Sequence, residues 1–439
     1  MYWSTEGENL LRKSLSLLAI FVASFVNGQT SLKLTLADAE ALALKNHPQI
    51  LAAQQEVAFA GHQITETRSA YYPTLTADVT GSQANKDARL GAGFLNDSTL
   101  FNRFGQGVSM SQLITDVGRT KNLVASSRLQ AQATGQNLTA TKYDVLIAVN
   151  RAYFDVLRAQ AVVKVAEQTV ATRQLLDDQV TALQKSNLKS LLDVSFADVA
   201  VSEAKLLLIN AQAGVDQAFA ELARAIGSDQ AVRYELADES MPATPPSKPD
   251  DLIAQAIQNR PELASLRFSR DSAYKFAEAE KDLNRPTVSL IGVAGFLPYI
   301  NQVGSTPIAS EYEAAAVNVS IPLFNGHLFS ARREAARSRA MESDQLLRDR
   351  QERVVRDVRV TWSATMTAFK RLDVTAQFVR QAALALDLAN NRYQLGLSSI
   401  VELTQSQLNL TQAEIENLNA KYDYQSQYAL LQYAIGALR

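Results

Sequence analysis

The sequence lacks cysteine, has few aromatic residues and runs for long stretches without proline or glycine. Without cysteine, the chain has no disulfide, no thiolate metal site, no cysteine nucleophile and no acylated lipoprotein cysteine. Aromatic residues make up 7% of the 439 residues and hydrophobic residues 47%, much of that alanine. This balance favours many helices packed through small side chains over several bulky globular cores. The net charge of −2 gives no indication of a nucleic-acid partner.

The sequence also lacks the motifs of known catalytic sites. The three histidines, His47, His62 and His327, do not have the spacing of metal ligands, and no phosphate-binding or dinucleotide-binding motif occurs. We therefore expect no catalytic residue, no metal and no cofactor, and an enzyme is the remotest hypothesis. The arginine-rich stretch 332–359 is interleaved with acidic residues, which is typical of a solvated, ion-paired helix face.

Only the N-terminus carries a long apolar run. Arg12 and Lys13 precede the run 15–26, which is short for a transmembrane helix and is followed by "NGQT". We interpret residues 1–28 as a secretory signal peptide, against a retained apolar anchor. No other segment reaches the length of a transmembrane helix, so a membrane crossing would require β-strands.

The sequence contains an internal repeat that covers most of its length. "KNHP" (45–48) is matched by "QNRP" (258–261), and "ELARAIG" (221–227) by "LLQYAIG" (430–436). A proline-rich stretch separates the two halves. We predict a first repeat over 29–235, an equatorial linker over 236–249 and a second repeat over 250–439.

Each repeat is expected to contain two helices, two strands, a long helix and a further helix. Alternating polar and apolar residues predict strands in runs of about ten residues, and stretches without proline or glycine predict the long helices. The expected strands are 74–83, 104–114, 287–297 and 314–324, and the expected long helices are 119–185, 190–226, 327–395 and 399–436.

The helix 190–226 has two apolar stripes. One alternates large residues with alanine at heptad spacing, from Val201 and Ala204 to Leu222 and Ala225. The second stripe includes Leu206 and Ile209. A helix with two such stripes packs against neighbouring helices on both sides, which favours a sheet-like or tubular array of helices over a solid bundle. An ordinary antiparallel bundle is the alternative, although it leaves the strand pairs unexplained.

The expected long helices reverse at one equivalent place in each half. Ser190-Leu-Leu-Asp193 and Ser399-Ile-Val-Glu402 both have the S-x-x-[DE] pattern of a helix-capping box. Gly396 can supply the left-handed residue that ends the preceding helix, and Asn187 can adopt the same conformation. We therefore predict two hairpin tips, with Ser190 and Ser399 as their caps.

Four strands cannot close a transmembrane barrel, since the smallest membrane barrels have eight. Three copies of the chain would give twelve strands and a twelve-helix tube. With its duplicated element order, the "Y-x-x-G" tip at 393–396 and "LFNG" at 323–326, the mature chain resembles the TolC-like outer-membrane efflux proteins.

The resemblance implies a mainly α fold with transmembrane β-structure: a homotrimeric, 12-stranded β-barrel in outer-membrane lipid, continued by a 12-helix α-barrel through the periplasm. It also implies two partners, a periplasmic adaptor and an inner-membrane transporter.

The resemblance further implies a gate at the periplasmic helix tips. Tyr393 matches the tip tyrosine of the family, Asp193 its first-half aspartate and Glu402 the first of two acidic positions. This chain departs at two positions, with Ser398 in place of an arginine and Gln405 in place of the second acidic residue. Asp193 and Glu402 are otherwise interpreted as helix caps alone, and Tyr393 as a packing residue.

The leading hypothesis is therefore a passive, gated exit duct of a tripartite efflux or type I secretion system. The alternative is a periplasmic coiled-coil adaptor or scaffold without a pore. The four predicted strands distinguish the two hypotheses, because a soluble adaptor does not require them.

Overall fold

The computed structural model describes residues 33–83, 89–90, 98–99, 103–228, 234–297 and 310–438. The predicted signal peptide, 1–28, lies outside the described residues. The chain divides into two compact units. The tip unit contains residues up to Lys45, Ala148–Ala243 and Leu372–Gln425, and the sheet unit contains Asn46–Ile147, Thr244–Arg371 and the residues from Ser426 onward. Each unit draws on both predicted repeats, so the repeats of the sequence are not the compact units of the fold.

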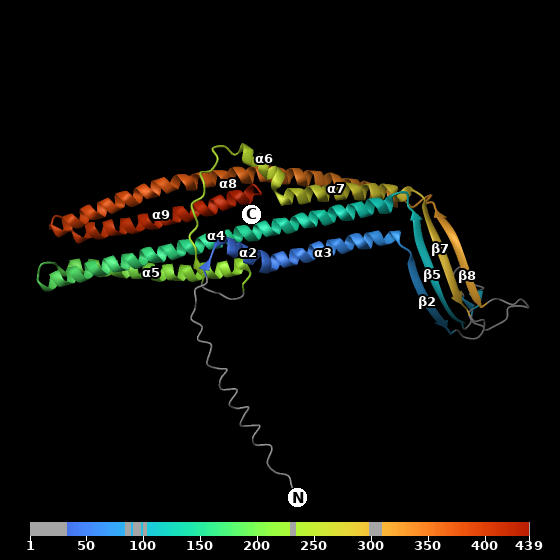
Figure 1. The fold of residues 1–439 in the computed structure, drawn as a ribbon, viewed down its shortest axis with the longest axis horizontal. Coiled ribbons are helices and arrows are strands. Elements are labelled where there is room, and N and C mark those ends of the chain that lie inside the picture. The colour runs from blue at the N-terminus through green and yellow to red at the C-terminus, as the bar shows by residue number, and fades with distance from the viewer. Residues whose placement is uncertain are drawn as a thin grey trace, which may run out of the picture. The chain divides into compact units, whose positions relative to one another are not determined.

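Four antiparallel strands form the main sheet of the sheet unit (Figure 1). They are β2 (Thr74–Ser82), β5 (Arg103–Thr115), β7 (Thr287–Phe296) and β8 (Glu311–Ser320), in the order β2-β5-β7-β8. The pairing of β5 with β7 joins the two halves of the sequence. Thr74 lies opposite Ser111, and Thr287 opposite Ser320, so the helix-connected ends of all four strands lie at one end of the sheet. A short separate pair consists of β3 (Arg89–Leu90) and β4 (Ser98–Thr99).

The last strand differs from its expected position. β8 begins at Glu311 and ends at Ser320, whereas the alternation of the sequence predicts 314–324. Pro322 has no N–H to donate to a ladder, which fits the end of the strand two residues earlier. Residues 321–324 instead connect the sheet to the following helix, and Leu323 and Phe324 are exposed.

Helices make up most of the described chain (Figure 1). The two longest, α4 (Arg119–Lys185) and α8 (Leu328–Gln394), each contain 67 residues and contribute to both units. A 67-residue helix is about 100 Å long. The others are α2 (Leu36–Asn46), α3 (Pro48–Arg68), α5 (Leu191–Ile226), α6 (Asp250–Asn259), α7 (Pro261–Lys281) and α9 (Ile400–Ala434), with short 3-10 turns η1 (Ser69–Tyr71) and η3 (Asp282–Asn284). No helix of the described chain has a segment both long and apolar enough to cross a membrane.

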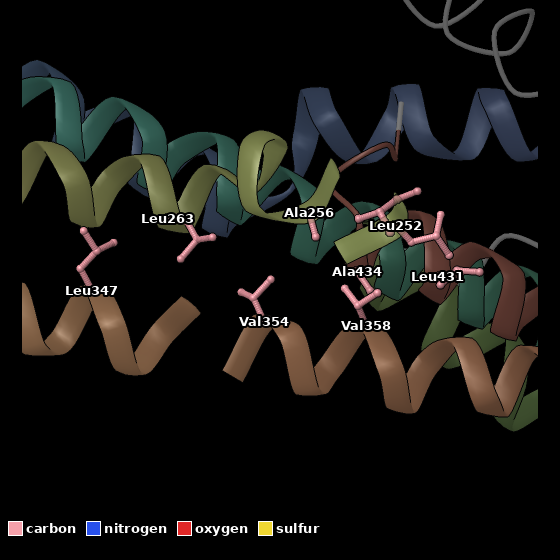
Figure 2. Close-up of a cluster of buried hydrophobic side chains, with 9 residues drawn as sticks. Leu252, Ala256, Leu263, Leu347, Val354, Val358, Leu431 and Ala434 are labelled. Carbon is pink, nitrogen blue, oxygen red and sulfur yellow. The ribbon is translucent and has the colours of Figure 1, made fainter. Parts of the chain in front are cut away.

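The core of the sheet unit lies where α6, α7, α8 and α9 meet (Figure 2). Leu252 and Leu263 pack with Val354, Val358 and other apolar side chains of this cluster. The C-terminal turn explains one of the repeated motifs: at Gly436, with φ of +70°, an added Cβ atom would lie 2.9 Å from the backbone carbon of Asn259. Gly436, at the end of the second copy of the "AIG" motif, is therefore required by the close approach of the backbone of "QNRP".

The core of the tip unit includes the first apolar stripe of α5. Val201, Ala204 and Leu222 are buried, as alternating large and small residues at a helix contact predict. The second stripe has no such cover among the described residues, since Leu206 is 58% exposed and Ile209 61% exposed.

The first part of the linker between the halves, up to Ala243, belongs to the tip unit. Its first part forms β6 (Glu235–Leu236), which pairs in parallel with β1 (Lys33–Leu34). The Tyr153 hydroxyl donates to the carbonyl of Ala237 at 2.7 Å and lies 3.0 Å from the carbonyl oxygen of Leu34. Burial raises the pKa of Tyr153 to about 12, so the hydroxyl remains a donor at neutral pH. This polar anchor holds both short strands against α4.

Candidate functional site: the two helical hairpin tips

The first hairpin tip joins α4 to α5. Asn187 takes the left-handed conformation, with φ of +57°, and the Leu188 N–H donates back to the carbonyl of Leu183 at 2.9 Å. Ser190 then caps α5 with a complete capping box. The Asp193 N–H donates to Ser190 Oγ at 3.1 Å, and the Ser190 N–H donates to Asp193 Oδ2 at 3.0 Å.

The second hairpin tip joins α8 to α9 by the same turn. Gly396 is left-handed, with φ of +72°, and the Leu397 N–H donates to the carbonyl of Arg392 at 2.8 Å. Ser399 Oγ accepts a hydrogen bond from the Glu402 N–H at 3.4 Å, which is longer than its counterpart at the first tip. The Glu402 carboxylate lies 3.4 Å from Arg392 Nε. Glu402 therefore links the two helices of its hairpin.

One apolar cluster joins the two tips. It contains side chains from α4, α5, α8 and α9, and its members are Leu176, Val180, Ala197, Ala389, Tyr393, Ile400 and Leu403. The side chain of Tyr393 is only 8% exposed, and its hydroxyl is buried without a hydrogen-bond partner in the described part of the chain. Tyr393 therefore contributes to this cluster through the packing of its aromatic ring and not through a hydrogen bond of its hydroxyl.

A cation lies on the face of this ring. Lys189 Nζ, from the first tip, is 4.1 Å from the ring centroid of Tyr393, which belongs to the second hairpin. A lysine ammonium at this distance is attracted by the ring quadrupole. The contact connects the two hairpins at their ends.

Sequence reasoning missed both cations of the tips, Lys189 and Arg392. Arg392 and Glu402 lie on either side of one predicted turn, so their opposite charges could have indicated the pair. The contact of Lys189 with Tyr393 has no such signal, because it depends on the packing of two hairpins from different halves of the sequence.

The two departures from the family pattern have separate surroundings. Ser398 Oγ is buried without a hydrogen-bond partner among the described residues. Gln405 is exposed, and its Nε2 donates to Asn409 Oδ1 at 3.0 Å, one turn along α9. Neither side chain replaces the charge that the family pattern has at its position.

The electrostatics of the first tip favour an ionised carboxylate. Hydrogen bonds from the Ser190 backbone and hydroxyl lower the pKa of Asp193, with a smaller contribution from the charge of Lys189. Repulsion between like charges around an axis would act in the opposite direction. Within one chain, the capping contacts therefore set the charge of Asp193.

The fold is that of outer-membrane efflux proteins. The crystal structure of a membrane protein from Pseudomonas aeruginosa superposes with a TM-score of 0.79, covers 91% of this chain and 93% of that chain, and is 20% identical. In sequence, the outer membrane efflux protein BepC of Brucella suis is 24% identical over 428 residues, which are 95% of this chain and 89% of BepC. The outer membrane protein TolC of Salmonella enteritidis is 25% identical over 88% of this chain and 78% of TolC.

A family model places the chain more firmly than any single relative. The model for outer membrane efflux proteins matches residues 41–228 and 252–437, one match to each half of the sequence. The chain belongs to this family. The predicted resemblance and the outer-membrane location are thereby confirmed, and the protein is a non-enzymatic efflux channel.

Proposed function

We propose that this protein is the passive exit duct of a tripartite efflux or type I secretion system. It works as a homotrimer, with a periplasmic adaptor and an inner-membrane transporter as partners. One observation carries the proposal: the four-stranded sheet has β2 and β8 as its outer strands. Membrane barrels have at least eight strands, so a single chain is too small to close one, and three chains supply twelve.

The helices support the same assembly. The second apolar stripe of α5, with Leu206 and Ile209, is exposed in the single chain. Exposed apolar stripes of this kind mark protein contacts. In the proposed trimer, these side chains pack against a helix of the neighbouring copy, which extends the α5 contacts into a closed wall of helices.

We further propose that the hairpin tips gate the periplasmic end of this duct. The gate region consists of Asp193, Tyr393, Gly396, Ser398, Glu402 and Gln405, with the caps Ser190 and Ser399. Within each protomer, Lys189 on the ring of Tyr393 joins the two tips, and Arg392 beside Glu402 joins the two helices of the second hairpin. Because Ser398 carries no charge, the closed state of this protein depends on these contacts in place of an arginine link.

Planar-bilayer conductance of the purified trimer tests the gate. We expect Glu402→Ala and Lys189→Gln to raise the conductance at low salt, because each removes a contact that holds the tips. Asp193→Ala should act less strongly, since its carboxylate is occupied by the Ser190 cap. Gln412→Ala is the matched control, at an exposed position of α9 outside the gate region. Unchanged conductance and ion dependence in the first two variants would contradict the proposed gate, while the proposed exit duct would still stand.

Charges on the sheet test the duct against the pore-less adaptor. Val79 is 69% exposed and Val317 64% exposed, on strands β2 and β8. We expect Val79→Asp or Val317→Asp to prevent assembly in the outer membrane if these side chains face lipid. Thr80→Asp is the control, because adjacent residues of a strand point to opposite faces. Normal function of both valine variants in a soluble fraction would support the adaptor.

A further inference from the structure

The arginines of α8 from Arg332 to Arg356 divide into two groups. Toward the middle of the helix, four of them form ion pairs: Arg348 with Glu352, Arg350 with Glu262, Arg353 with Asp349 and Arg356 with Asp357. This part is the ion-paired helix face that the sequence predicts. In the first turns, Arg332, Arg337 and Arg339 are exposed, and none has an ion pair within the described part of the chain. Ion pairing therefore explains only one of the two groups.

The unpaired arginines lie next to the sheet. α8 begins at Leu328, eight residues after the end of β8 at Ser320. The connecting segment carries two large apolar side chains that protein does not cover, Leu323 at 93% exposure and Phe324 at 82%. At the same end of the sheet, Tyr71 and Tyr72 precede β2 and are 45% and 57% exposed.

Exposed aromatic side chains at the end of membrane strands typically mark the boundary between hydrocarbon and headgroups. The residues Tyr71, Tyr72, Leu323 and Phe324 place this boundary at the helix-connected end of the sheet. With a helical rise of ~1.5 Å per residue, Arg332 then lies ~6 Å and Arg339 ~17 Å beyond Leu328. The first distance is comparable to the thickness of the headgroup layer, which is about 5–8 Å on each side of a bilayer, whereas the backbone of Arg339 lies beyond that layer.

The direction of the side chains brings the charges closer to the membrane. Cα–Cβ bonds of an α-helix tilt toward its N-terminus, and the N-terminus of α8 is the end connected to the sheet. The long guanidinium side chains of Arg337 and Arg339 therefore lean toward the headgroups. Between Leu328 and Ala340 the helix carries four arginines and one carboxylate, Glu334, which pairs with Arg333 at 3.4 Å.

We propose that the N-terminal end of α8, with Arg332, Arg337 and Arg339, binds the phosphate groups of anionic phospholipids in the periplasmic leaflet of the outer membrane. Guanidinium groups match phosphate oxygens in charge and in bidentate geometry. Leu323 and Phe324 insert among the acyl chains next to the same headgroups. The arginines thereby form a lipid-binding collar that fixes the depth of the sheet in the bilayer.

Lipid titration of the full-length trimer tests the collar. The wild type and a triple variant, R332Q/R337Q/R339Q, are titrated in neutral detergent with phosphatidylglycerol and with zwitterionic phosphatidylethanolamine, and bound lipid is counted by native mass spectrometry. We expect the triple variant to bind phosphatidylglycerol about tenfold or more weakly, since each arginine near anionic headgroups contributes to binding. Binding of phosphatidylethanolamine should change little.

Two control variants complete the design. R151Q/R359Q/R380Q removes the same charge from three exposed arginines outside the first turns of α8, and it should bind phosphatidylglycerol like the wild type. R332K/R337K/R339K keeps the charge and should retain most of the binding, which also guards against a variant that fails to fold. Planar-bilayer conductance of the triple glutamine variant checks that the duct itself is intact.

Three outcomes would overturn the collar. The first is wild-type binding of phosphatidylglycerol by the triple glutamine variant, and the second is an equal loss in the remote control. The third is dissociation of the trimer with unchanged lipid binding by the trimers that remain, which would assign the arginines to the contact between protomers. Retained conductance with lost lipid selectivity supports the collar independently of the gate.

Discussion

The two hairpin tips have the same backbone turn and use their acidic residues differently. At the first tip, Asp193 completes a capping box with Ser190, and its carboxylate serves the turn in which it lies. At the second tip, the Glu402 carboxylate lies beside Arg392 on the opposite helix of the hairpin. A side chain longer by one methylene can reach across the turn, whereas the shorter one bonds its own cap. The two turns therefore share their backbone geometry, and their carboxylates have different partners.

The largest difference in stability between the two tips is expected from Tyr393, because the first tip has no matching buried aromatic residue at its turn. We expect Tyr393→Ala to cost about 3–5 kcal/mol of local stability through lost packing and to remove the ring beneath Lys189. Hydrogen exchange measured by mass spectrometry should show at least a hundredfold loss of protection at both tips. Tyr393→Phe should stay close to the wild type, because the hydroxyl has no partner in the described part of the chain.

An equal effect of the phenylalanine variant would contradict this interpretation of Tyr393. It would show that a hydrogen bond of the hydroxyl, and not the packing of the ring, holds the tips.

The left-handed residues give the next largest effect. Gly396 has φ of +72° and Asn187 φ of +57°. Gly396→Ala should cost about 1–2 kcal/mol, because a Cβ atom clashes with the backbone in this conformation. Asn187→Gly should change stability by a few tenths of a kcal/mol at most, since asparagine tolerates this conformation. Peptide-level hydrogen exchange at each tip measures both, and a cost of Asn187→Gly equal to that of Gly396→Ala would show that the two turns are not equivalent.

The tips also show what sequence can predict. The turn positions follow from local chemistry, since proline, glycine and cap residues act on their neighbours. The alternation of the sequence predicts the strand 314–324, three to four residues later than β8, because the alternation continues past Pro322 while the hydrogen-bond ladder does not. The contact of Lys189 with Tyr393 was out of reach, because it depends on packing between halves. The same packing explains why the compact units cut across the two repeats.

Removing the N-cap serine should destabilise the two tips by different amounts, and both costs should be smaller than those of Tyr393→Ala and Gly396→Ala. Ser190→Ala should cost about 1 kcal/mol, as is usual for the loss of an N-cap. Ser399→Ala should cost less, since its hydrogen bond to the Glu402 N–H is 3.4 Å long and the Glu402 carboxylate is engaged with Arg392. Hydrogen exchange of the first turns of α5 and α9 compares the two. Equal costs would show that the second tip also depends on a complete capping box.

The smallest effect is the pH dependence of the first tip. The folded-state pKa of Asp193 is lowered by hydrogen bonds from Ser190, so its stabilisation is fully present above the ordinary aspartate pKa of 3.8. The stabilisation is lost as the pH falls through the folded-state value, below 3.8. We expect the difference in melting temperature between the wild type and Asp193→Asn to stay constant from pH 7 to about pH 4 and to shrink only below that. A difference that shrinks already between pH 6 and pH 5, roughly one to two units above the unperturbed carboxylate range, would show that like charges of neighbouring copies, and not the cap, set the ionisation of this residue.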